Sequence, residues 1–101
     1  QCTILPISEK YNEYGREILN LLKNYDIRGL VDERNEKIGR KIRDAEVNKI
    51  PFMLIIGEKE ASENKVSVRR QGTGDLGSFT IEEFASMISK EIEEKLLQFN
   101  N

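Results

Sequence analysis

An unbroken apolar run from Phe52 to Ile56 constrains the fold of this chain more than any other segment. The preceding Ile50-Pro51 ends the connection, because the residue before proline disfavours helix and proline suits the first position of a strand. Gly57 closes the run. Five apolar residues bounded in this way predict a strand covered on both faces, as in a parallel or mixed sheet. Ligands of such sheets bind beyond the carboxyl ends of the strands.

The hydrophobic pattern around this run predicts alternating strands and helices. Right-handed crossovers place the first two helices on opposite faces of the sheet if the second and third strands flank the first. The predicted fold is therefore α/β, a three-layer α/β/α sandwich. The predicted strands are 3–7, 26–32, 52–56, 66–69 and a short one near 78–79; the predicted helices are one that follows Ser8 and extends to Tyr25, one over 36–47 and one that begins at a capping box over 80–83; a polar turn is predicted over 61–65.

Length and composition limit the classes of function. The 101 residues predict one domain over 1–101, short for an enzyme that must also enclose a substrate. The chain has no histidine and one cysteine, Cys2, which excludes imidazole-based nucleophilic catalysis and a Cys/His zinc site. We expect no catalytic residue and no metal site. The lone cysteine is typical of a reducing, cytoplasmic setting, and no apolar run approaches the ~20 residues that span a bilayer. The missing initiating methionine predicts a piece of a longer protein.

Polar clusters follow two of the predicted strands, at 32–35 and at 57–60. The segment 34–49, which begins in the first cluster, holds six basic and three acidic residues, whereas 80–97 holds two basic and five acidic ones. This asymmetry predicts that one side of the domain binds an anionic ligand whose edges can form specific hydrogen bonds, such as a nucleic acid. A solvated helix face is the alternative. The six basic residues are Arg34, Lys37, Arg40, Lys41, Arg43 and Lys49.

Individual side chains in these clusters have two interpretations each. Asn35 is either the N-cap of the helix over 36–47 or a base-reading residue, and the two roles are compatible because a cap uses only the amide oxygen. Glu60 could accept from N1–H and N2–H of an unpaired guanine, an edge that only a single-stranded base exposes. We predict that Glu60 and Arg69 form a guanine-reading pair, because the two come within reach if the strands over 52–56 and 66–69 pair. Gly39 is costly in a helix unless something approaches it closely. Arg43, Lys49 and Arg69 are base contacts or plain surface; Lys37, Arg40 and Lys41 are candidates for phosphate contact or electrostatic steering.

A glycine motif and the carboxylates give weaker evidence of function. Gly72-x-Gly74-x-x-Gly77 matches the dinucleotide-binding pattern by letter, but it precedes a strand instead of opening a helix behind one. The carboxylates that could act as general acids or bases, such as Asp32 and Glu58, lie beside Arg or Lys, so ion pairing is the better interpretation. We expect neither a dinucleotide site nor acid–base catalysis.

Five stretches are distinctive when taken together: 32–43, 49–54, 57–60, 66–69 and 75–77. They resemble the C-terminal anticodon-binding domain of threonyl-tRNA synthetases, over nearly the whole chain from Ile4 to about Glu94. The most specific is RNEKIG-x-KIR, which the related prolyl, histidyl and glycyl domains are not expected to share. Two departures affect only the second strand and a peripheral contact: Gly29 replaces a β-branched residue and Arg40 replaces an aromatic one.

The resemblance implies a mixed five-stranded sheet with three helices. It also implies a module that docks on the anticodon loop of threonine tRNA and reads the second and third anticodon bases. The family's base-contacting positions match Asn35, Arg43, Glu60 and Arg69, with Lys49 as a basic neighbour. The alternatives are a protein-interaction or regulatory module that keeps the fold without reading RNA, and the equivalent domain of a prolyl, histidyl or glycyl enzyme.

For the parent protein the resemblance implies a threonine–tRNA ligase that uses ATP with magnesium, and zinc. Its catalytic domain would lie upstream in the same chain, and the parent would be a homodimer. We expect the present segment to hold no cofactor and to be non-catalytic by itself.

Overall fold

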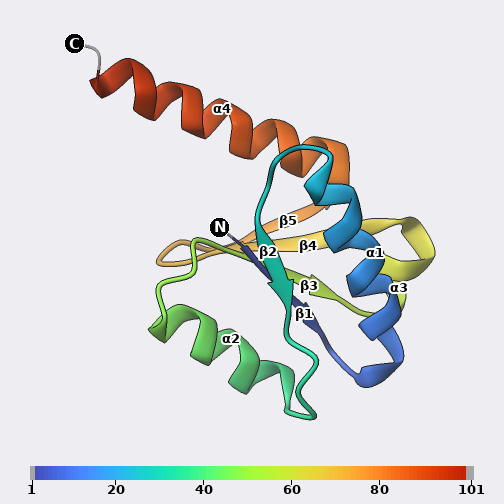
Figure 1. Ribbon diagram of the computed structural model, residues 1–101. Helices are drawn as coiled ribbons and strands as arrows, with labels where there is room; N and C mark the ends of the chain where they lie inside the picture. Colours follow the sequence, from blue (N-terminus) through green and yellow to red (C-terminus); the bar gives the residue numbers. More distant parts are fainter. Residues whose placement is uncertain (1, 100–101) are drawn as a thin grey trace.

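A five-stranded mixed sheet forms the middle of the molecule in the computed structural model, which describes the backbone of residues 2–99 and the side chains of residues 2–91. The order across the sheet is β2-β1-β3-β4-β5 (Figure 1). β1 pairs in parallel with β2 and β3, while β3–β4 and β4–β5 are antiparallel. The strands are β1 Cys2–Pro6, β2 Gly29–Val31, β3 Phe52–Ile56, β4 Lys65–Arg70 and β5 Gly74–Thr80.

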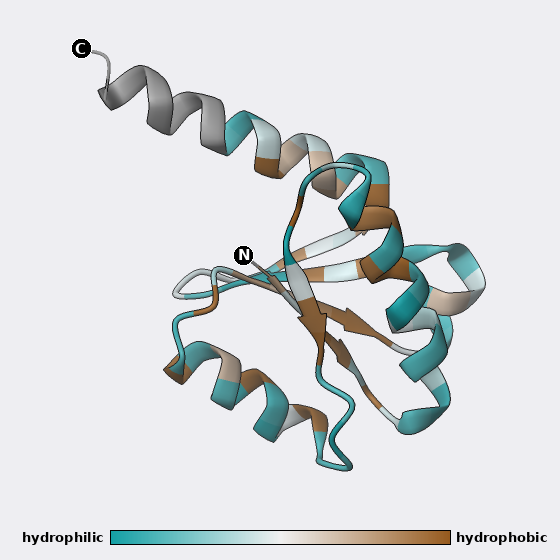
Figure 2. Ribbon diagram, viewed as in Figure 1, coloured by the Kyte–Doolittle hydropathy of each residue, from teal (hydrophilic) through white to brown (hydrophobic). Residues whose placement is uncertain are grey.

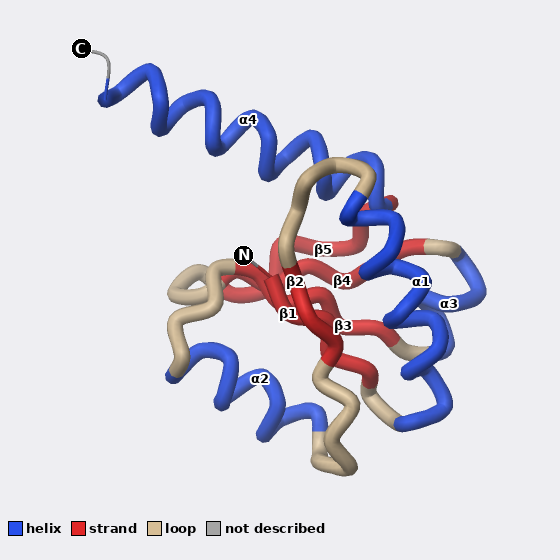
Figure 3. The backbone as a smooth tube through the Cα atoms, viewed as in Figure 1, coloured by secondary structure: helices blue, strands red, loops and turns tan. Residues whose placement is uncertain are grey.

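Helices cover both faces of this sheet, which confirms the predicted three-layer sandwich (Figure 3). α1 and α4 pack on one face and α2 packs on the other, as predicted from the crossovers, because strands two and three do flank strand one. The helices are η1 Glu9–Tyr11, α1 Asn12–Lys23, α2 Ile38–Val47, α3 Glu58–Glu63 and α4 Ile81–Phe99.

β3 divides the hydrophobic core into two clusters. Phe52, Leu54 and Ile56 join the cluster beneath α1 and α4, and Met53 joins a smaller cluster beneath α2. These four side chains are at most 5% exposed, and the apolar strands lie at the centre of Figure 2. The prediction of a strand covered on both faces is therefore confirmed. Truncating one of these side chains would cost about 2–5 kcal/mol.

The predicted capping box at the start of α4 is confirmed. The Thr80 N–H donates to the Glu83 carboxylate at 2.8 Å, and the Glu83 N–H donates to the Thr80 hydroxyl at 3.1 Å. These two reciprocal bonds satisfy backbone donors at the end of the helix. They also hold the pKa of Glu83 below its ordinary value.

Several element boundaries differ from those predicted. The polar turn predicted over 61–65 is mostly helical, because α3 spans Glu58–Glu63 and makes a fourth α-helix among the described residues where three were expected. β2 is three residues long, and α2 begins at Ile38 instead of 36. β5 starts at Gly74, well before 78. β5 pairs with β4 through its backbone even though its glycines have low strand propensity.

Gly29 is explained by its neighbour in the β1–β2 register, Cys2. A Cβ atom added at Gly29 would lie 2.8 Å from the Cys2 sulfur and 3.1 Å from the Cys2 carbonyl oxygen. The cysteine is 3% exposed, and burial raises the pKa of its thiol to about 11, so the group stays protonated at neutral pH. The buried thiol thus occupies the space that a side chain on β2 would need.

We expect Gly29→Ala to lower the free energy of unfolding by about 1–3 kcal/mol, because the added methyl overpacks against the Cys2 sulfur. In a Cys2→Ala background the same change should cost less, which urea unfolding of the four proteins can measure. Gly39→Ala is the matched control, since no atom lies within 4 Å of the Cβ position at Gly39. Equal costs of Gly29→Ala in both backgrounds would show that the sulfur is not the obstacle.

Candidate nucleic-acid interface

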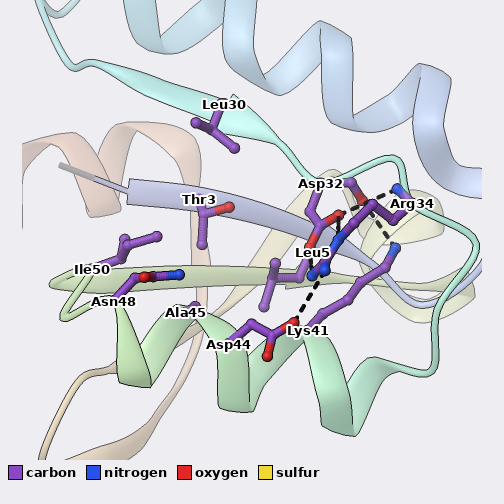
Figure 4. Close-up of a pocket in the computed structure, with 10 residues that line it drawn as sticks. All are labelled: Thr3, Leu5, Leu30, Asp32, Arg34, Lys41, Asp44, Ala45, Asn48 and Ile50. Carbon is purple, nitrogen blue, oxygen red and sulfur yellow. Dashed lines mark hydrogen bonds and ion pairs between the residues drawn. The ribbon is translucent and has the colours of Figure 1, made fainter.

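The loop that connects β2 to α2, residues 32–37, is tied to β1 and to α2. The Asp32 N–H donates to the carbonyl of Ile4 in β1 at 2.9 Å. The Asp32 carboxylate accepts from the Arg34 guanidinium at 2.8 and 2.9 Å, and the same guanidinium lies 3.1 Å from Asp44 of α2 (Figure 4). Arg34 is therefore engaged within the protein, which confirms the interpretation of Asp32 as an ion-paired carboxylate. A signal was present in the Asp-x-Arg spacing, which suits a local ion pair.

Lys41 does not lie on the surface, so its prediction as a phosphate contact is wrong. It is 2% exposed, and its ammonium donates to the carbonyl of Asp32 at 2.9 Å (Figure 4). The same ammonium donates to the carbonyl of Pro6 at 3.1 Å. The physical reason is helical periodicity. Position 41 falls on the same face of α2 as Ile38 and Ala45, which turns toward the sheet. A long aliphatic stem allows a lysine to occupy such a position when its charge finds acceptors.

Asn35 does not cap α2. The residue in the N-cap position is Lys37, and α2 begins directly after it. Asn35 is exposed, and no hydrogen bond engages its side chain within residues 2–91. The capping interpretation is therefore wrong, and the amide of Asn35 is presented to solvent beyond the carboxyl ends of β1 and β2.

Glu60 lies in the first turn of α3, directly after β3. One of its carboxylate oxygens accepts the Gly57 N–H at 2.8 Å, which fixes the orientation of the group. A carboxylate has about four acceptor positions, so most of its capacity remains available. The Tyr14 hydroxyl of α1 holds this short helix by contacts with the carbonyls of Lys65 at 2.7 Å and Glu60 at 3.2 Å. Tyr14 was not predicted as a site residue from the sequence.

Arg69 lies at the other end of β3, because the β3–β4 register sets it opposite Met53. Its Nε is 3.6 Å from the Glu46 carboxylate of α2, and this buried nitrogen lacks a hydrogen-bond partner within the described part of the chain. A hollow of about 360 Å³ opens between these two side chains and the β4–β5 turn over 71–74. The exposed Lys49 follows the end of α2 and precedes β3.

The predicted pair of Glu60 and Arg69 is therefore not formed. β3 and β4 do pair, as expected, but the antiparallel register returns residue 69 to the beginning of β3 while Glu60 follows its end. Three residues separate Met53 from Ile56 along the strand, which is about 10 Å. The two side chains can contact one ligand only if it extends along the sheet.

The exposed side of α2 carries the remaining predicted residues. Lys37 and Arg43 are exposed, and Arg40 forms an ion pair with Glu36 at 3.2 Å. Gly39 opens onto solvent, because no atom lies within 4 Å of its Cβ position. A hollow of about 430 Å³ is lined by Gly39, Arg40, Arg43 and Asp44.

Comparison with known protein families identifies residues 1–91 as an anticodon-binding domain. The chain belongs to this family. A threonine–tRNA ligase of Bacteroides thetaiotaomicron is 58% identical over 93 residues, and one of Cytophaga hutchinsonii is 52% identical over 96 residues. The matches cover 92% and 95% of this chain but only 14% and 15% of those relatives. The segment thus spans about one seventh of the curated relatives that it matches.

Solved structures agree with the family assignment. The RNA-binding domain of threonyl-tRNA synthetase from Cryptosporidium parvum Iowa II superimposes with a TM-score of 0.83 at 28% identity, over 89% of this chain and 23% of that one. Histidyl-tRNA synthetase from Nostoc sp. PCC 7120 reaches 0.82 at 17% identity, over 91% of this chain and 22% of that one, which shows a shared fold. The resemblance to the threonyl-tRNA synthetase domain is confirmed by these relatives.

In the described part of this anticodon-binding domain, no group of three or more histidine, cysteine, aspartate or glutamate side chains could hold a metal ion. None of its helices combines the length and apolar character that crossing a bilayer requires.

The ion pair at the base of the 32–37 loop predicts acid sensitivity. Hydrogen bonds from Arg34 hold the pKa of Asp32 below its ordinary value. The contribution of ionised Asp32 to folding stability is complete above the pKa that Asp32 has in the unfolded state. It is lost as pH falls through the lower pKa of the folded state, because the unfolded state binds the proton first. We expect Asp32→Asn to cost about 1–3 kcal/mol at neutral pH. This deficit should shrink below about pH 4.

Urea unfolding between pH 7 and pH 2 measures the difference. Arg34→Met removes the cause of the lowered pKa, so this variant should also be less stable than the unaltered domain at neutral pH, and its deficit should shrink over the same pH range. The double variant Asp32→Asn, Arg34→Met should be little less stable than either single variant. A deficit that stays constant down to pH 2 would contradict the assignment.

Proposed function

We propose that this domain binds the anticodon loop of threonine tRNA and reads the second and third anticodon bases. The observation that carries the proposal is a row of polar side chains along the α2 side of the sheet, with the exposed Asn35 at one end and the partly buried Arg69 at the other. The ten residues of α2 span about 15 Å, which suits several nucleotides of a single strand. We call Asn35, Arg43, Lys49 and Arg69 the α2 surface.

The chemistry of the row suits unpaired bases. An asparagine amide carries both donors and an acceptor, and arginine carries a fork of donors, so both can read base edges. Glu60, just past β3, is assigned to N1–H and N2–H of the middle base, an unpaired guanine. Since Arg69 lies near the opposite end of β3, we assign it to a different nucleotide.

Two local features support the approach of a ligand to this side. Gly39 weakens α2, and no side chain of this protein fills the space beside it. The bare backbone would allow a ribose–phosphate chain to come close. Lys37 and Arg40 flank the position and are assigned to phosphate contact or electrostatic steering. The ion pair of Arg40 with Glu36 reduces the attraction of Arg40 for phosphate.

The relatives that match this chain are threonine–tRNA ligases, which supports a wider proposal for the parent. The parent ligates threonine to its tRNA with ATP and magnesium, uses zinc in a catalytic domain upstream in the same chain, and acts as a cytoplasmic homodimer. The present segment contributes tRNA identity and no catalytic group.

The rival proposal is a module of the same fold that contacts protein and no longer reads RNA. Titration of the domain with a threonine-tRNA anticodon stem-loop separates the two. Phosphate contacts make the affinity fall as salt rises, and base reading makes it fall when the middle base is changed. Binding that is absent at low salt would favour the rival.

We expect Glu60→Gln to weaken binding of the native stem-loop by about 1–3 kcal/mol and to relax discrimination at the middle base. Glutamine can still accept the Gly57 N–H, so α3 should keep its cap. The matched control is Glu63→Gln, which removes the same charge from the exposed end of the same helix. Equal weakening on every anticodon, or by both variants, would show that Glu60 acts only through overall charge.

At Lys49 we expect folding stability and RNA affinity to favour different residues. Its φ of 56° is in the left-handed region, where glycine is favoured after a helix. We expect Lys49→Gly to raise the free energy of unfolding by up to about 1 kcal/mol while flattening the plot of log affinity against log salt by roughly 0.7. Lys49→Gln is the control, because it removes the charge and keeps the strained backbone. If Lys49→Gly left the affinity for the stem-loop unchanged, Lys49 would be plain surface.

A further inference from the structure

The buried ammonium of Lys41 joins three elements at one point. Its acceptors are the carbonyl of Pro6 at the end of β1 and the carbonyl of Asp32 just after β2, and its stem belongs to α2. These are the carboxyl ends of two neighbouring parallel strands, where sheets of this kind place their ligands. Figure 4 shows the side chain reaching from α2 toward Asp32.

Packing alone does not account for a lysine at this position. Removing a charged group from water costs free energy, and an apolar side chain of similar length would fill the same space without that cost. The ammonium instead fixes two backbone carbonyls. Its effect therefore falls on the path of the backbone as it leaves β2, directly before the 32–37 loop.

The rest of the loop continues from this fixed point. Asp32 holds Arg34 through its carboxylate, with the Arg34 N–H at 3.2 Å and the guanidinium at 2.8 Å. The guanidinium also reaches Asp44, one turn beyond Lys41 on α2. Glu33 forms an ion pair with Arg16 of α1. Both residues before Asn35 are thus held, while the Asn35 side chain is exposed to solvent.

We propose that Lys41 is a positioning residue for base reading: its buried ammonium holds the carboxyl ends of β1 and β2 against α2 and so fixes the loop that presents Asn35. The inference rests on the proposed function, because the contact of Asn35 with RNA is itself proposed. A binding site needs its contacting groups held in place by supporting residues, and Lys41 supplies that support from inside the protein.

The test compares Lys41→Met with Lys37→Met. Both remove one lysine charge from α2 or its N-cap, but Lys37 is exposed. The probe is the threonine-tRNA anticodon stem-loop and a set of stem-loops with single changed anticodon bases. Two quantities are measured for each protein. The first is the Asn35-dependent preference, which is the part of the affinity ratio between native and changed stem-loops that Asn35→Ala abolishes. The second is the slope of log affinity against log salt. Amide hydrogen exchange of Asp32, Arg34 and Glu36 is measured without RNA.

Lys41→Met should reduce the Asn35-dependent preference roughly fivefold or more. In an Asn35→Ala background, Lys41→Met should cause no further loss of base preference. Its salt slope should equal that of the unaltered domain. Exchange of the three amides should accelerate roughly tenfold or more, the scale of one lost charge-assisted hydrogen bond. Lys37→Met should leave preference and exchange unchanged and flatten the salt slope by roughly 0.7.

A flattened slope with intact preference in Lys41→Met would overturn the proposal, because Lys41 would then act as a phosphate contact. Unchanged exchange of the three amides would overturn it as well. If Lys41→Met does not fold, Arg34→Met, whose side chain is half exposed, tests the same support from the surface; an unaltered preference in that variant would count against the proposal. If the unaltered domain shows no Asn35-dependent preference, the proposed function fails at Asn35, and the exchange measurement still decides the role of Lys41.

Discussion

Burial of β3 on both faces is the constraint on which the rest of the structure depends. Alternate side chains of Phe52–Ile56 enter two separate clusters, so each face needs its own helical cover. The parallel pairing of β1 with both β2 and β3 requires two crossovers, and these supply α1 on one face and α2 on the other. The loop before α2 then has to begin beyond the carboxyl ends of β1 and β2. The position of the candidate interface therefore follows from how the core is covered.

The sequence was sufficient to predict the layers and the capping box of α4, whereas the strand order around β1 entered only as a condition that the structure fulfils. These features depend on periodicity and on short-range capping, which a single sequence displays directly. The pattern was insufficient for α3, because α3 has no buried residue and leaves no apolar stripe to detect. Its stability comes from polar contacts with Gly57 and with Tyr14, which lies 46 residues from Glu60 in the chain.

The candidate site was predictable in its location and only partly in its membership. The residues gathered by the resemblance do lie along α2 and the ends of β3. Lys41 was misplaced because a basic residue in a basic run was assigned to solvent, although its i, i+3 and i+4 spacing with Ile38 and Ala45 points inward. The pairing of Glu60 with Arg69 failed because strand pairing alone does not specify register. The eight residues between Ile56 and Lys65 return the chain so that Arg69 faces Met53.

Several features that local physics disfavours lie on the α2 side of the molecule. Gly39 weakens a helix without filling any space, Lys49 adopts a left-handed backbone, and the buried Nε of Arg69 lacks a hydrogen-bond partner among the described residues. The other two described non-glycine residues with positive φ are Asp26 and Asn64, types that tolerate this conformation. Rules of local stability are broken most often where function requires it. In this domain the broken rules line one edge of α2, while the buried ammonium of Lys41 holds the opposite side of the same helix to the sheet. The helix is thus fixed from within, while its outer edge, where we propose that RNA binds, remains exposed.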